Sequence, residues 1–101
     1  MIDQPPRLII HAADEASLSR ARSNAANFLA AVDNGVVEIV INADAVAPAL
    51  ATPHATDTHL RVCANTLHNQ QLEAPDHLVQ VAAAVVYITD RQRDGWAYIR
   101  A

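Results

Sequence analysis

Hydrophobic residues follow two different patterns along the chain, and these patterns separate short strands from helices. Short runs rich in aliphatic residues are typical of strands buried on both faces of a parallel sheet. Such runs, each with one polar residue, occupy residues 8–11, 36–41, 60–63 and 78–82. Residues 96–100 alternate instead, which predicts a fifth strand at a sheet edge.

The segment between the first two runs predicts the longest helix. Asp14 is the expected N-cap, and apolar residues then recur at helical spacing on one stripe. This stripe consists of Leu18, Ala21, Ala25, Phe28, Leu29 and Val32. We expect Gly35 to stop the helix, after which the strand at 36–41 follows within a turn. A strand, a helix and a strand at this spacing form a βαβ unit, which implies parallel strands and a right-handed crossover.

The other segments continue this alternation of strands and helices. Residues 43–50 predict a short helix that stops near Pro48, residues 51–58 a loop, and residues 65–70 another short helix. Apolar residues at helical spacing from 85 to 92 predict a last helix, which ends at Asp94-Gly95. The pattern therefore predicts a single domain over residues 1–101, built as a three-layer α/β structure.

Composition indicates a thin core. Of the 101 residues 51% are hydrophobic but only 4% are aromatic, so Ala and Val supply most of the buried surface. At about 25 cal/mol for each Å² of apolar surface buried, a core of this kind gives marginal stability. Burial of further surface between subunits would offset this, and we therefore expect the chain to form a homo-oligomer.

Charge and cysteine content limit the kinds of partner and the cellular compartment that we expect. A net charge of −4, with seven arginines spread along the chain, argues against a nucleic-acid partner. A single cysteine allows no internal disulfide and fits the reducing cytoplasm. The first residues do not resemble a signal peptide, and no apolar stretch reaches the roughly 20 residues that span a membrane. We expect a cytoplasmic protein without membrane contact.

Chemistry is expected at the carboxyl ends of the strands, where parallel sheets bind their ligands. His11, Asn42, Cys63 and Ala83-Ala84 fall at these ends. Cys63 directly precedes a helix start, whose free backbone N–H groups and partial positive charge favour the thiolate. The alternative is that Cys63 packs as a small apolar residue, as most free cysteines do.

Three residues are candidates to support Cys63. His11 is a candidate to hold or accept the thiol proton, although a structural histidine at a strand end is an equal alternative. Asn65 and Thr66 fit as caps of the helix start, whose backbone N–H groups also suit an anion such as thiosulfate, sulfite or a persulfide. The remaining histidines lack metal-ligand spacing, and two glycines exclude a dinucleotide fingerprint, so we expect neither metal nor cofactor.

Four segments, taken in order, resemble the DsrE/DsrF-like family of small α/β proteins. They are Asn24-x-x-Asn27, residues 37–41, residues 62–67 around Cys63, and residues 91–100. The resemblance implies an α/β/α domain with a five-stranded, mostly parallel sheet, assembled as a homotrimer or homohexamer. In members that relay sulfur, a cysteine accepts sulfur as a persulfide and passes it to a partner protein, and Cys63 stands at that position.

Two functions are consistent with these sequence features. The first is a sulfur carrier, a sulfurtransferase-like protein in which the Cys63 thiolate takes sulfur from a donor and hands it to a relay partner. The second is a non-catalytic oligomeric module that binds a small anion or a partner protein. In that module Cys63 is structural, and the expected interface residues are Asn24, Asn27, Tyr87 and Trp96.

Overall fold

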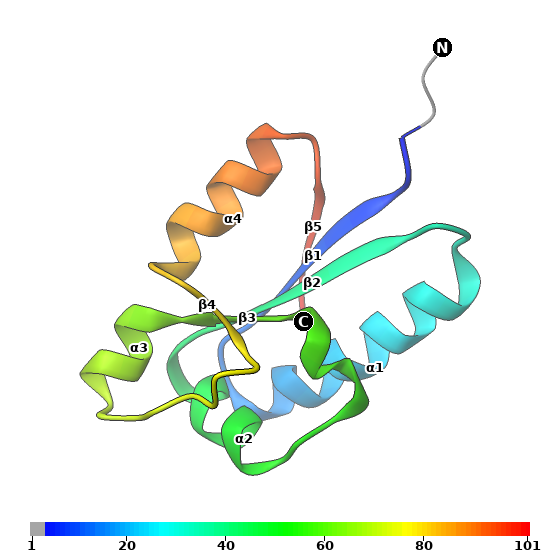
Figure 1. Ribbon diagram of the computed structural model, residues 1–101. Helices are drawn as coiled ribbons and strands as arrows, with labels where there is room; N and C mark the ends of the chain where they lie inside the picture. Colours follow the sequence, from blue (N-terminus) through cyan, green and yellow to red (C-terminus); the bar gives the residue numbers. More distant parts are fainter. Residues whose placement is uncertain (1–3) are drawn as a thin grey trace.

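Five strands form one sheet in the order β4-β3-β2-β1-β5, and every neighbouring pair is parallel. Figure 1 shows the computed structural model, which describes residues 4–101. The strands are β1 (Arg7–Ala12), β2 (Val36–Ile41), β3 (Leu60–Cys63), β4 (Val79–Val81) and β5 (Ala97–Arg100). The α-helices are α1 (Glu15–Ala31), α2 (Val46–Ala51), α3 (Ala64–Asn69) and α4 (Ala84–Arg93). The predicted α/β fold, with its fifth strand at a sheet edge, is confirmed.

The sheet lies between two helical layers of unequal size. Because side chains alternate along a strand, Ile10 and Ile39 face α1 and α2, whereas Ile9 and Val40 face α4. Figure 1 shows α1 and α2 together on one side of the sheet and α4 on the other. Within residues 4–101, none of the helices is long and apolar enough to cross a membrane.

The ends of α1 combine one confirmed prediction with two corrections. Asp14 caps the helix as predicted, because its carboxylate accepts the Ser17 backbone N–H at 2.7 Å. At the other end Asn34, with φ 60°, takes the left-handed conformation that we expected of Gly35. Gly35 is needed for space instead, since a Cβ there would lie 2.8 Å from the Phe28 ring. Leu29, expected on the buried stripe, is 36% exposed, whereas the neighbouring Phe28 packs against the core.

The region between β2 and β3 contains more regular secondary structure than predicted. Residues 43–45 form a 3-10 turn, and Pro48 lies inside α2 rather than at its end. Proline is tolerated there because the first helical turn leaves its N–H groups unpaired. The predicted loop at 51–58 contains a 3-10 helix, η2 (Ala55–His59), whose start is capped by the His54 and Asp57 side chains.

A buried polar network joins α4 to the sheet. Glu38, in the middle of β2, is only 5% exposed and faces α4. Its carboxylate accepts the Tyr87 hydroxyl at 2.6 Å and Arg91 Nε at 3.0 Å, and it pairs with Arg61 at 3.1 Å. The Arg91 guanidinium also stacks over the Trp96 ring, 4.8 Å from its centroid. Since apolar contacts on this face are few, the network is a main tie between the two layers.

Candidate functional site

Cys63 lies where the starts of two helices meet. It is the last residue of β3 and the N-cap of α3, and α4 begins beside it at Ala84. The backbone N–H groups of Thr66, Ala84 and Asn65 and the Thr66 hydroxyl are the polar groups that act on its pKa. The residue is 5% exposed and packs with the aliphatic side chains of Ile9, Val40 and Ile88.

Two opposing effects act on the pKa of Cys63. Burial raises this pKa, because the thiolate loses contact with water. The polar groups of Thr66, Ala84 and Asn65 beside the sulfur favour the thiolate, and together they outweigh burial. The net result is a pKa below the ordinary value, as expected from the position of Cys63 before a helix start.

This pKa shift makes stability depend on pH. Because the pKa of Cys63 is lower in the folded chain than in the unfolded chain, ionisation of the thiol favours folding. The gain is complete above the ordinary value of 9.0 and is lost as the pH falls through the lowered folded value. Relative to Cys63→Ser, the free energy of unfolding should therefore rise from about pH 7 to pH 9 in urea titrations. A difference that stays flat would contradict a stabilised thiolate.

His11 belongs to a second polar group, at the same carboxyl end of the parallel strands as Cys63. Its Nε2 lies 3.0 Å from the Asn42 side-chain oxygen, and its Nδ1 lies 3.2 Å from the Tyr98 hydroxyl. Since the Asn42 oxygen only accepts, Nε2 carries the proton in the neutral ring, and Nδ1 accepts the Tyr98 hydroxyl. Both ring nitrogens are therefore occupied by neighbouring side chains.

A cavity of about 350 Å³ separates this polar group from α4. His11, Asn42 and Tyr98 form the wall on the sheet side, and Ala84, Ile88 and neighbouring residues of α4 form the opposite wall. Ala84 and Ile88 also pack in one apolar cluster with Cys63, so the cavity ends next to the thiol. This is the place where a parallel α/β sheet is expected to bind a ligand.

The predicted site residues fall into two groups rather than one. Thr66 is buried and lowers the pKa of Cys63, whereas the Asn65 backbone N–H donates to the Ala82 carbonyl at 3.3 Å and the Asn65 side chain is exposed. His11 is not paired with Cys63, because β2 lies between their strands and the imidazole is bonded to Asn42 and Tyr98.

The expected interface residues have different surroundings. Asn24 and Asn27 are exposed on α1, whereas Tyr87 and Trp96 are half-buried beside the Glu38 network. Sequence reasoning missed Tyr98 as a site residue, because the pairing of β5 with β1 that brings it to His11 is not encoded in a local sequence pattern. Within residues 4–101, no three His, Cys, Asp or Glu side chains gather to hold a metal ion.

Comparison with known proteins supports the fold. No protein-family model matches the chain, and no curated protein matches it. Among solved structures, the chain is similar to the protein of unknown function MTH1491 from Methanobacterium thermoautotrophicum. The two share 23% identity with a TM-score of 0.72, over 95% of this chain and 99% of the other. At this identity the likeness shows the fold alone: this is an α/β protein with a five-stranded parallel sheet.

Proposed function

We propose that the protein is a sulfur carrier that uses Cys63 as the acceptor. The observation that carries the proposal is the position of Cys63 at the end of β3, beside the starts of α3 and α4, and the lowered pKa of its thiol agrees with it. A thiolate is the form that attacks sulfur, and the N–H groups at these helix starts suit the negative charge of a persulfide. The resemblance of residues 62–67 to the DsrE/DsrF-like pattern points in the same direction.

The transfer step needs no additional reactant. The Cys63 thiolate attacks the outer sulfur of a donor persulfide, and a new S–S bond forms at Cys63. The S–S bond of the donor breaks, and its inner sulfur leaves as a thiolate with the electron pair. One thiolate is consumed and one is released, so oxidation states balance and the sulfur remains available to a relay partner.

The donor is proposed to enter through the cavity that ends at Ala84. Ala84 and Ile88 contact Cys63 on one side and line the cavity on the other. Because Cys63 is 5% exposed, transfer requires these two residues of α4 to shift away from the sulfur. Asn42, whose side-chain oxygen is bonded to His11, then holds the polar end of the donor at the opposite wall through its side-chain N–H groups.

The low exposure of Cys63 also favours a second function, that of a non-catalytic module. Here Cys63 packs as an apolar residue, and the cavity beside His11 holds a small anion or a segment of a partner protein. Homo-oligomerisation, as a trimer or hexamer, stays a prediction for both functions, and the mass of the protein in solution tests it.

Incubation with glutathione persulfide, followed by intact mass measurement, separates these functions. The carrier should gain about 32 Da, one sulfur atom, and should lose it again to an added thiol. Because Cys63 is the only cysteine, Cys63→Ser is a complete control and should gain nothing. An unmodified wild-type protein, or an equal adduct on Cys63→Ser, would exclude the carrier and leave the module.

A further inference from the structure

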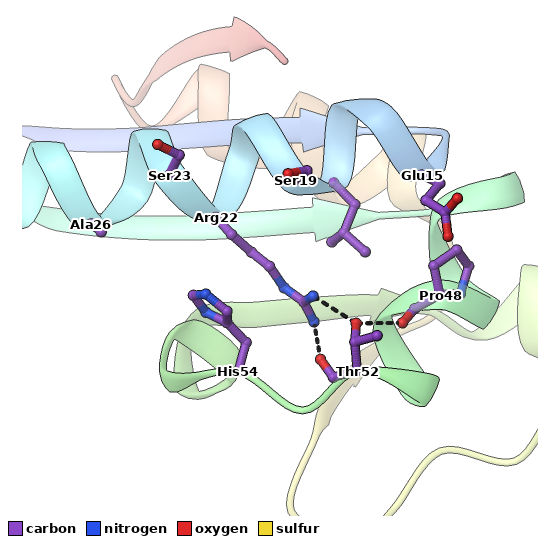
Figure 2. A pocket seen from close by; sticks show the side chains of 9 residues that line it. Glu15, Ser19, Arg22, Ser23, Ala26, Pro48, Thr52 and His54 are labelled. Atoms are coloured by element: carbon purple, nitrogen blue, oxygen red, sulfur yellow. Dashed lines mark hydrogen bonds between the residues drawn. The ribbon is translucent and has the colours of Figure 1, made fainter.

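A second cavity lies on the opposite side of the sheet from α4, between α1 and the chain that follows α2. It encloses about 560 Å³ and is open to solvent along one side. Its apolar wall contains Leu18, Ala26 and Pro48, and Figure 2 shows the polar side chains around them. We call this cavity the Arg22 groove, because the Arg22 side chain crosses it from α1 to Thr52 (Figure 2).

Arg22 is buried to an unusual degree for an arginine, with 8% of its surface exposed. Its terminal nitrogens donate to the Thr52 hydroxyl at 2.8 Å and to the Thr52 carbonyl at 2.7 Å. They approach Asp57 only to 3.5 Å, which is long for an ion pair. These bonds attach the end of α2 to α1, which explains why the arginine lies inside the protein.

These hydrogen bonds leave one donor of the Arg22 side chain without an acceptor. Among the described residues 4–101, no acceptor lies within hydrogen-bond distance of Arg22 Nε, and this nitrogen is buried. A buried N–H without an acceptor is destabilising, so it calls for a partner. The partner that suits a guanidinium N–H best is a carboxylate or another oxyanion.

Further donors surround Arg22 in the groove. His54 Nδ1 accepts the Thr56 backbone N–H at 3.1 Å, so the proton of the neutral ring is on Nε2. His54 lines the groove together with Ser19 and Ser23, one helical turn apart on α1. The groove thus combines a cationic donor, neutral donors and an aliphatic wall.

We propose that the Arg22 groove binds the carboxylate of a small aliphatic acid, either a free carboxylic acid or an amino acid. The carboxylate accepts the Ser19 and Ser23 hydroxyls, and a small rotation of the Arg22 side chain toward the groove brings its buried Nε–H within reach of the same carboxylate. The aliphatic part packs on Leu18 and Pro48. Asp57 and Glu15 disfavour a doubly charged phosphate, because both carry negative charge at or beside the groove. Glu15 also offers an acceptor for the ammonium group of an amino acid.

Titration of the ¹⁵N-labelled protein tests the proposal at the atom concerned. The probes are leucine and 4-methylpentanoate, which differ by the amino group, with inorganic phosphate for comparison at constant ionic strength. We expect the Arg22 Nε–H resonance, identified by its absence from Arg22→Lys, to shift to saturation with a Kd of roughly 1 mM. Stronger binding of leucine indicates an amino-acid site, and stronger binding of 4-methylpentanoate indicates a site for free acids.

A pair of charge variants on α1 gives the matched control. Ser19→Glu places a carboxylate in the groove and should weaken binding at least about tenfold, because like charges repel there. Asn24→Glu adds the same charge at an exposed position that does not line the groove, and it should bind like the wild type. Ser19 and Asn24 are both exposed, so these two variants should fold and test the proposal even if Arg22→Lys does not fold. Absence of a saturable shift, equal binding by Ser19→Glu, or a response to phosphate alone would overturn the proposal.

Discussion

Replacement of Glu38 by glutamine is expected to lower the free energy of unfolding by about 3 kcal/mol. The carboxylate is buried between Arg61 and Arg91 and also accepts the Tyr87 hydroxyl. A neutral amide keeps the size of the side chain but leaves two guanidinium groups without their counter-charge in a partly buried place. Loss of one partner from a buried ion pair costs more than the pair itself contributes, because the remaining charge stays desolvated.

Urea unfolding of Glu38→Gln and two companion variants measures this effect. Tyr87→Phe removes one hydrogen bond to Glu38 without changing the charges and should cost about 1 kcal/mol. Glu73→Gln removes the same charge from an exposed side chain and should change stability by less than about 0.5 kcal/mol. If Glu38→Gln were as harmless as Glu73→Gln, the network would not be what holds α4 to the sheet.

Thr66→Val should weaken both the thiolate and the fold. The Thr66 hydroxyl lowers the pKa of Cys63 and accepts the backbone N–H of Ala43 at 3.0 Å. Valine keeps the shape but lacks the hydroxyl, so the pKa of Cys63 rises and the Ala43 N–H loses its partner. Ala43 has a φ of 47°, a left-handed conformation that this bond helps to hold. The loss of stability should be about 2 kcal/mol.

Reaction with iodoacetamide between pH 6 and pH 9, together with urea unfolding, checks the effect of Thr66→Val. At about pH 7 the rate of reaction of the variant should be at least about threefold lower, since less of the thiol is ionised. Asn65→Ala is the matched control, because Asn65 acts through its backbone N–H, which alanine retains. A wild-type rate for Thr66→Val, or an equal slowing by Asn65→Ala, would contradict the assigned contacts.

Most elements of the fold were predictable because each depends on residues that are close in sequence. The aliphatic run at 36–41 and the Asp14 cap each predict their element from a few neighbouring residues, and both predictions are confirmed. The order of the strands depends on contacts between distant segments, such as β5 beside β1, and no local pattern carries this information. The 3-10 helix η2 escaped prediction because its cap is a histidine, an unusual capping residue.

The candidate site was predictable in its position but not in its pairing. His11, Asn42 and Cys63 were predicted at the carboxyl ends of strands, where they lie. Which residues bond to one another depends on strand order, so the partners of His11 became evident only from the structure. The burial of Arg22 and Glu38 was missed for a related reason. Charged residues are usually exposed, and the partners that allow these two to be buried lie far along the chain.

The pairing of β5 with β1 has a consequence for the order in which the sheet is completed. β1 lies inside the sheet, yet one of its two neighbours, β5, is separated from it by four α-helices and three strands. A nascent chain leaving the ribosome can join β1, β2 and β3 early, but one side of β1 stays open until residues 97–100 emerge. During synthesis this open strand side is the surface most exposed to mispairing, and a chaperone that shields β-strands would act there.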